Sequence, residues 1–259
     1  MEFIDTHTHC TDEAFSAAEQ DTFVERAVGA GVRKMLLADV DSSERTQMYA
    51  AAGRHPGVLF PMLGLYPGSV DKEWKREFEA LEGWKGKGAV AIGEIGLDYH
   101  YDDVPKELQR EWFVRQLDMA RKLKLPVVIH SRDAAQDTMD ILAEEHARDI
   151  GGGMHCFSYT KEVAREVLKM GFFIGIGGVV TFKNARKLKE AVAYTPIESI
   201  VLETDCPFLA PEPYRGARNS SLNLRYIARA IAQIKDLDED EVVEKTWANA
   251  HRLYHLRDN

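Results

Sequence analysis

The segment FIDTHTHC, residues 3–10, places Asp5, His7 and His9 at every second position. Side chains at every second position of a β-strand lie on one face, so a strand here would direct both imidazoles to the same side. A His-x-His pattern alone is a weak indication of a metal site. Its meaning depends on whether the fold brings other ligand-type residues to meet it.

Short apolar runs like this one recur along the chain and alternate with longer amphipathic stretches that have helical spacing. The candidate strands lie at 3–7, 32–38, 58–64, 89–93, 126–130, 152–156, 172–177 and 199–205. Eight strands that are each followed by a helix predict an α/β fold, a (β/α)₈ TIM barrel, which commonly takes about 250 residues. An open doubly wound sheet is the alternative. A phosphate-binding loop is expected after the first strand of such a sheet, and no GxGxxG motif occurs there.

The composition limits the protein's class. No linker or low-complexity segment divides the chain, so we predict one domain over 1–259. No apolar run approaches the roughly 18 residues of a membrane span, and no secretory signal is recognisable at the start. Three widely spaced cysteines favour a reducing cytoplasm. The net charge of −9 excludes a strongly basic nucleic-acid-binding surface, so a polyanion would need a local basic patch or a metal.

Ligand-type residues fall where the predicted strands end, which is where TIM barrels carry their catalytic groups. The first, fourth, fifth, sixth and eighth strands end in His7 and His9, Glu94, His130, His155 and Asp205, respectively. Four imidazoles and two carboxylates are a ligand set for a pair of divalent ions. Any one of these residues, taken alone, is equally compatible with core packing or with shaping a loop.

Strand alternation also predicts which neighbouring side chains lie on the same face as the candidate ligands and which lie on the opposite face. Asp5 shares a face with His7 and His9, and Glu203 shares one with Asp205, so both are candidate carboxylates that orient the imidazoles from beneath. A salt bridge to a buried cation is the alternative for each. The three cysteines each follow a candidate ligand directly and are predicted to pack behind the barrel wall; they are Cys10, Cys156 and Cys206.

The motifs resemble those of the TatD family of metal-dependent deoxyribonucleases, within the amidohydrolase-like barrels, over nearly the whole chain. They are DTHTH (5–9), GEIGLDYH (93–100), PVVIHSRDA (126–134), HCFSYT (155–160), GFFIGIGGVVTF (171–182), ETDCPFLAPEPYRGARN (203–219) and NAHRLYHL (249–256). The resemblance implies two divalent ions (Mg, Mn or Zn). It assigns one ion to His7, His9 and Asp205, the other to His130 and His155, and a bridging role to Glu94.

One position departs from the family pattern. Members frequently carry a Gly-x-His-Pro segment after the third strand, whereas this chain has GLYPG (64–68), with Tyr66 at the His position. A tyrosine hydroxyl can still hydrogen-bond a phosphate oxygen, but it does not titrate near neutral pH.

The resemblance implies a deoxyribonuclease, which we expect to be cytoplasmic, of the 3′–5′ exonuclease type, and to act on single-stranded or frayed DNA ends without a membrane or an obligate protein partner. Asp205 and Glu94 are the candidate catalytic residues, with Asp205 orienting the attacking water and taking its proton. The candidate phosphate contacts are Arg132, Tyr66, Arg215 and Arg218, and the alternative for each arginine is a surface or inter-loop salt bridge. The alternatives are a hydrolase of small esters, lactones or amides on the same metals, and a non-catalytic metal-binding protein.

Overall fold

The strands form a closed parallel barrel in the computed structural model, which describes residues 1–11, 16–70 and 74–257. They are β1 (Phe3–Thr8), β2 (Val32–Leu37), β3 (Leu59–Pro61), β4 (Ile92–Asp98), β5 (Val127–Arg132), β6 (Gly152–Met154), β7 (Phe173–Ile176) and β8 (Ile200–Leu202). Parallel pairing runs through β1–β2–β3 and through β4–β5–β6–β7–β8.

Main-chain contacts join these two ladders into a ring. On one side, a parallel bridge links Leu63 to Ile92. On the other, the Asp205 amide donates to the His7 carbonyl over 2.9 Å, and the His9 amide donates to the Cys206 carbonyl over 2.7 Å. The TIM-barrel prediction is therefore confirmed, and the open doubly wound sheet is excluded.

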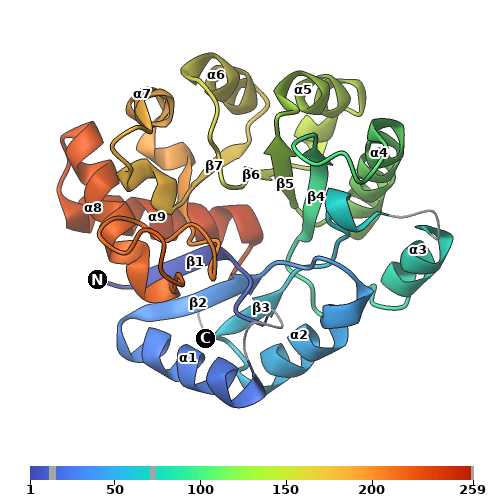
Figure 1. The fold of residues 1–259 in the computed structure, drawn as a ribbon, viewed down its shortest axis with the longest axis horizontal. Helices are drawn as coiled ribbons and strands as arrows, with labels where there is room; N and C mark the ends of the chain where they lie inside the picture. Colours follow the sequence, from blue (N-terminus) through green and yellow to red (C-terminus); the bar gives the residue numbers. More distant parts are fainter. Residues whose placement is uncertain (12–15, 71–73, 258–259) are drawn as a thin grey trace.

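Helices surround the barrel (Figure 1). They are α1 (Ala17–Gly29), α2 (Ser42–Arg54), α3 (Trp74–Glu82), α4 (Lys106–Leu123), α5 (Ala135–Glu144), α6 (Lys161–Lys169), α7 (Arg186–Tyr194), α8 (Leu224–Lys235) and α9 (Glu239–Tyr254). Short 3₁₀ turns are η1 (Pro67–Ser69), η2 (Ala147–Asp149), η3 (Gly178–Thr181), η4 (Ile197–Ser199) and η5 (Ser221–Asn223). None of the described helices is long and apolar enough to cross a membrane.

Helix α4 shows how the sequence builds this outer layer. Its buried residues Phe113, Leu117 and Ala120 recur at four- and three-residue spacing, and the buried Trp112 lies next to Phe113, which gives the helix one apolar side. The helix ends where Lys124 takes a left-handed conformation with φ 56°. The apolar side of α4 packs into a large cluster between the strands and the helices.

A smaller cluster fills one end of the barrel interior. It combines residues of six strand regions with the end of α9, and its members are Ile4, Leu36, Met62, Ala91, Val128, Val201, Ala250, Leu253, Tyr254 and Leu256. Asn249 of α9 is also buried and donates to the carbonyls of Ile197 and Ile200, both over 2.7 Å. The last helix therefore plugs the barrel, and the opposite end, where the strands terminate, carries the polar residues.

Strand β4 differs from its prediction. The predicted strand covered residues 89–93 with Glu94 at its end, whereas β4 continues to Asp98 and holds Glu94 in its interior. Gly96, at φ 139°, lets β4 approach β5 so closely that a Cβ there would lie 2.0 Å from the His130 carbonyl oxygen. Strand β8 is shorter than predicted, so Asp205 lies in the loop that follows it.

Candidate metal centre

Glu94 lies at the centre of the predicted ligand set and is almost fully buried. Its Oε2 atom lies 3.3 Å from His7 Nε2 and 3.6 Å from His9 Nε2. Its Oε1 atom lies 2.6 Å from His130 Nδ1 and 3.0 Å from His155 Nε2. Each carboxylate oxygen therefore faces a different pair of imidazoles.

Asp205 completes the half of the centre that contains His7 and His9. Its Oδ1 atom lies 3.3 Å from His9 Nε2 and 3.8 Å from His7 Nε2. Asp205 has a left-handed backbone, with φ 57°, and its amide is held by the His7 carbonyl across the seam between β1 and β8. The structure thus brings all six predicted ligands together, from β1, β4, β5 and the loops after β1, β6 and β8.

The converging atoms fit divalent cations. The ring nitrogens of His7 and His9 approach within 3.3 Å, and those of His130 and His155 within 3.1 Å. Neutral imidazole nitrogens and carboxylate oxygens are electron-pair donors, and a cation placed among them satisfies several at once. Three overlapping groups have all their ligand atoms within 4.8 Å of one another: His7–His9–Glu94, His7–His155–Asp205 and Glu94–His130–His155.

The electrostatics keep both carboxylates of the centre ionised. Burial opposes the charge on Glu94, but His155 and His130 outweigh it and hold the pKa of Glu94 well below its usual range. Burial likewise opposes the charge on Asp205, and the hydrogen bond to His9 still lowers the Asp205 pKa. For His7, burial and the neighbouring His155 lower the pKa, which favours the neutral, metal-binding form.

Asp98, the last residue of β4, is a functional candidate that the sequence analysis missed. Its Oδ2 atom lies 3.0 Å from His130 Nε2 and accepts a hydrogen bond from the Tyr66 hydroxyl over 2.6 Å. The Gln109 side chain fixes the main chain of Asp98, accepting from its amide over 2.8 Å and donating to its carbonyl over 2.9 Å. Asp98 is therefore the carboxylate that orients a candidate ligand from the side opposite Glu94.

Tyr66, at the position where the family frequently has histidine, thus contacts the centre through Asp98. Burial and the hydrogen bond to Asp98 raise the pKa of Tyr66, so its hydroxyl stays protonated. The same network lowers the pKa of Asp98 to about 2, against the effect of burial, through His130 and Tyr66. The sequence signal for Asp98 was the GLD pattern that follows Glu94. This pattern indicates a site residue only if the fourth strand is recognised as extending to Asp98.

The two carboxylates predicted beneath the imidazoles have different surroundings. Asp5 accepts hydrogen bonds from the Thr204 amide over 2.9 Å, the Thr204 hydroxyl over 2.5 Å and the Ser221 hydroxyl over 2.6 Å. These bonds tie β1 to the segment after β8, and no hydrogen bond from Asp5 to an imidazole is found among the described residues. Glu203 does face the centre, with Oε1 3.7 Å from His155 Nδ1, and it also accepts from the Cys156 amide.

A buried ion pair that the sequence did not suggest supports Glu94 from the β2 side. Asp39 Oδ2 lies 2.6 Å from Arg45 Nε and accepts from the Gly64 amide over 3.0 Å. The Asp39 carbonyl in turn accepts from the Glu94 amide over 3.2 Å. The loop after β2 therefore fixes the main chain that carries the central carboxylate.

A cavity of about 580 Å³ is lined by five of the six residues, all except the fully buried His7. Two of the predicted phosphate contacts, Tyr66 and Arg132, line it. Cys156 lines it as well, so the prediction that all three cysteines pack behind the wall is wrong for Cys156; Cys10 and Cys206 are fully buried. Because Cys156 lies after the end of β6, with φ 44°, strand alternation does not govern its direction.

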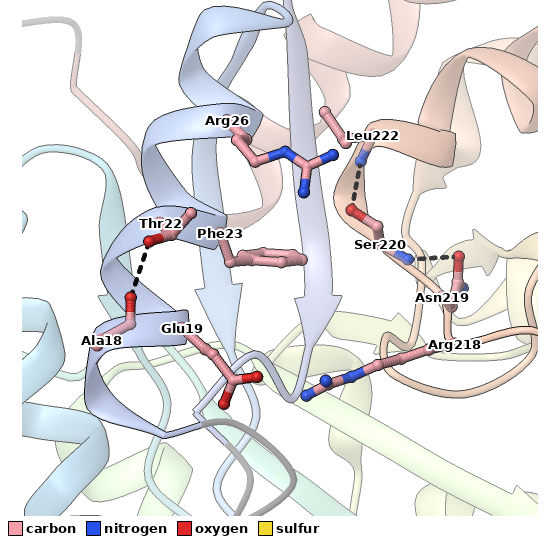
Figure 2. A pocket seen from close by; sticks show the side chains of 9 residues that line it. All are labelled: Ala18, Glu19, Thr22, Phe23, Arg26, Arg218, Asn219, Ser220 and Leu222. Atoms are coloured by element: carbon pink, nitrogen blue, oxygen red, sulfur yellow. Dashed lines mark hydrogen bonds between the residues drawn. The ribbon is translucent and has the colours of Figure 1, made fainter.

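The other two predicted phosphate contacts lie outside this cavity. Arg215 stacks on the Phe182 ring, with its guanidinium carbon 4.3 Å from the ring centre. Arg218 lines a second cavity, of about 520 Å³, between α1 and residues 218–222. Figure 2 shows Arg218 extending towards Glu19 there, and the two are electrostatically coupled.

Comparisons with known proteins agree with this geometry. A model of the family described as TatD related DNase matches residues 4–255. The chain is 40% identical, over 97% of its length and 98% of the relative's, to the uncharacterized metal-dependent hydrolase YabD of Bacillus subtilis. The crystal structure of YjjV, a TatD homologue from Escherichia coli, matches with a TM-score of 0.89 at 28% identity over 98% of both chains.

The barrel is also shared more widely. The organophosphorus hydrolase of Deinococcus radiodurans matches with a TM-score of 0.67 at 15% identity, over 97% of this chain and 92% of that chain. At this identity the likeness shows the fold alone.

Proposed function

The chain belongs to the TatD-related DNase family of metal-dependent hydrolases, and on that premise we propose that it hydrolyses phosphodiester bonds of DNA. The observation that carries the proposal is Glu94, whose two carboxylate oxygens face two separate pairs of imidazoles. That arrangement suits a pair of divalent ions sharing one bridging carboxylate. The proposed substrate end is single-stranded or frayed, and the proposed direction is 3′–5′.

The proposed ligand roles follow from which oxygen each imidazole faces. His7 and His9, with Asp205, would hold one ion, and His130 with His155 would hold the other. Glu94 would contribute one oxygen to each. Mg²⁺, Mn²⁺ and Zn²⁺ are the candidate ions, because imidazole suits Zn²⁺ and carboxylate suits Mg²⁺ and Mn²⁺.

The ions, when bound, would supply positive charge against the scissile phosphate and lower the pKa of water at the site. Asp205 would orient the attacking water and accept its proton, since His9 keeps this carboxylate ionised and it lines the cavity. Glu94 would hold the two imidazole pairs in their relative positions during the reaction. Asp98 would hold His130 in one orientation through Nε2.

The proposed phosphate contacts divide into two groups. Arg132 and Tyr66 line the cavity, so they would meet the nucleotide being released. A role for Arg215 or Arg218 would require a strand that extends beyond the cleaved nucleotide, because both lie outside this cavity. The net charge of −9 makes such local positive groups necessary for a polyanion.

A small-molecule ester, lactone or amide hydrolase is the second candidate, because a cavity of about 580 Å³ falls in the range of small-ligand sites. A substrate panel separates the two candidates. Metal-loaded protein is incubated with labelled single-stranded DNA, duplex DNA and RNA, and with a set of lactones and carboxylic esters. Cleavage of single-stranded DNA that a chelator abolishes supports the nuclease. Lactone or ester hydrolysis without oligonucleotide cleavage overturns it.

A further inference from the structure

We propose that the mouth of the metal cavity is a base-stacking clamp that holds one unpaired nucleobase between Phe208 and the Tyr101–Arg132 pair. This inference rests on the proposed nuclease function and adds to it the part of the substrate that is recognised. It predicts that the protein selects a nucleotide by its base as well as by its phosphate.

Phe208 forms the first wall of the clamp. Its side chain lines the cavity yet is 52% exposed, which makes it one of the most exposed large hydrophobic side chains among the described residues. The Phe208 ring packs edge-on against the His9 ring, with ring centres 5.9 Å apart, so it lies directly beside the candidate metal centre. Leu209, 40% exposed, continues the same wall.

The loop that carries Phe208 is fixed by its surroundings. The buried Asn219 side chain donates to the Phe208 carbonyl over 2.7 Å and to the Thr204 carbonyl over 2.8 Å. Gly178 lies so close to this loop that a Cβ there would be 2.2 Å from the Leu209 carbonyl oxygen. A fixed exposed aromatic ring offers stacking area without a large loss of conformational entropy on binding.

Tyr101 and Arg132 form the second wall. Tyr101 is 52% exposed and lines the same cavity. The Arg132 guanidinium carbon lies 5.3 Å from the centre of the Tyr101 ring, and Nη1 lies 3.5 Å from the Tyr101 hydroxyl. Both a tyrosine ring and a planar guanidinium stack on nucleobases, and the guanidinium charge also attracts the phosphate.

The barrel places these walls on opposite sides of the metal centre. Tyr101 follows β4 and Arg132 ends β5, whereas Phe208 follows β8 and contacts His9 after β1. In a ring of eight strands in chain order, β4 and β5 lie half a turn from β8 and β1. A phosphate bound at this centre when its ions are present would therefore carry its base into the space between the walls.

An unpaired base is the occupant that matches these features. Both faces of a base inside a duplex are covered by its neighbours, so only a base at a single-stranded or frayed end can be stacked from two sides. The walls remain about half exposed, which leaves the mouth open for the rest of the strand. An aliphatic lactone or ester offers no flat π face to these residues.

The test compares two oligonucleotides of the same sequence, one with a normal 3′-terminal nucleotide and one with an abasic terminal residue. We expect Phe208→Ala and Tyr101→Ala to raise KM for the normal strand about tenfold, with kcat little changed, because stacking on one aromatic side chain has that magnitude. The abasic strand should show no such change. Phe208→Tyr should restore the KM. Tyr194→Ala, at the end of α7 and 48% exposed, is the matched control and should behave as wild type.

Fluorescence anisotropy of metal-loaded protein with the same labelled strands, each carrying a cleavage-resistant phosphorothioate at its terminal linkage, measures base contact without cleavage. A preference of wild type for the normal strand that disappears in Phe208→Ala supports the clamp even if no cleavage occurs, in which case only the nuclease proposal fails. Cleavage of both strands with equal KM, or a normal-to-abasic ratio that Phe208→Ala and Tyr101→Ala leave unchanged, overturns the clamp and leaves the nuclease standing. Absence of both cleavage and base preference overturns both.

Discussion

Replacing Asp98 by asparagine tests whether this carboxylate orients a metal ligand. Asp98 Oδ2 lies 3.0 Å from His130 Nε2, while the other ring nitrogen, Nδ1, faces Glu94 at 2.6 Å. With Asp98 charged, His130 carries its proton on Nε2 and presents the Nδ1 lone pair to the metal side. The Asp98→Asn substitution would remove the charge that fixes this tautomer while keeping the size of the side chain.

The magnitude follows from the one bond that is weakened. A hydrogen bond to a charged group contributes about 1.5–3 kcal/mol, which corresponds to roughly 10- to 100-fold in a binding constant. Loss of a carboxylate behind a metal-binding imidazole usually has an effect in this range. We therefore expect Asp98→Asn to weaken metal binding about 10- to 100-fold, measured by isothermal titration calorimetry on chelator-treated protein.

Two variants serve as controls for this experiment. Asp137→Asn removes a carboxylate that also accepts from a tyrosine hydroxyl, that of Tyr99 over 2.6 Å, but contacts no imidazole among the described residues, and it should leave metal affinity unchanged. Tyr66→Phe removes the second partner of Asp98 while the carboxylate stays, so its effect should be under about threefold. If Asp98→Asn bound metal as tightly as Asp137→Asn, the orienting role of Asp98 would be refuted.

Three further predictions concern the centre and its support. Asp205→Asn should lower DNA cleavage about 10²- to 10⁴-fold in steady-state assays, and full activity with normal metal content would remove Asp205 as the base. Asp5→Ala should lower the free energy of unfolding in urea by about 3 kcal/mol, because the bonds from the Thr204 amide, the Thr204 hydroxyl and the Ser221 hydroxyl, at about 1 kcal/mol each, are lost together with a long one from the His7 amide; unchanged stability with weaker metal binding would mean that Asp5 acts on the imidazoles instead. Adding metal at about a hundred times its Kd at about pH 8 should raise Tm by about 5–10 °C, and the same metal concentration should raise Tm less at about pH 6, because protons compete for the imidazole nitrogens; absence of any rise would contradict a metal centre in the folded state.

The fold was accessible from the sequence because its pattern is repetitive. Eight apolar runs separated by amphipathic stretches leave few arrangements that bury both faces of each strand, and the barrel is one of them. Within that frame, placing ligand-type residues near strand ends was enough to predict that His7, Glu94, His130 and Asp205 would converge, even though β4 extends past Glu94 and β8 stops before Asp205.

The positions that could not be predicted depend on local departures from regular strand geometry. Alternation placed Asp5 under the imidazoles, but the register of β1 on β2 shifts between Asp5 and Thr8, and the carboxylate hydrogen-bonds to Thr204 and Ser221. Glycines interrupt the apolar pattern in the second half of β4, so the sequence did not indicate that the strand continues to Asp98. The ion pair between Asp39 and Arg45 joins a loop to a helix, so no periodic sequence pattern predicts it.

End-labelled DNA cleavage by wild type and by Glu94→Ala is the measurement that tests the central claim most directly. Metal-loaded proteins, matched for folding by circular dichroism, are incubated with single-stranded and duplex DNA labelled at the 5′ end, and the products are resolved on a sequencing gel. We expect the wild type to shorten the single strand stepwise from its 3′ end and Glu94→Ala to leave it intact, because Glu94 faces both imidazole pairs. Equal cleavage by the two proteins, or intact DNA with both, would contradict the claim.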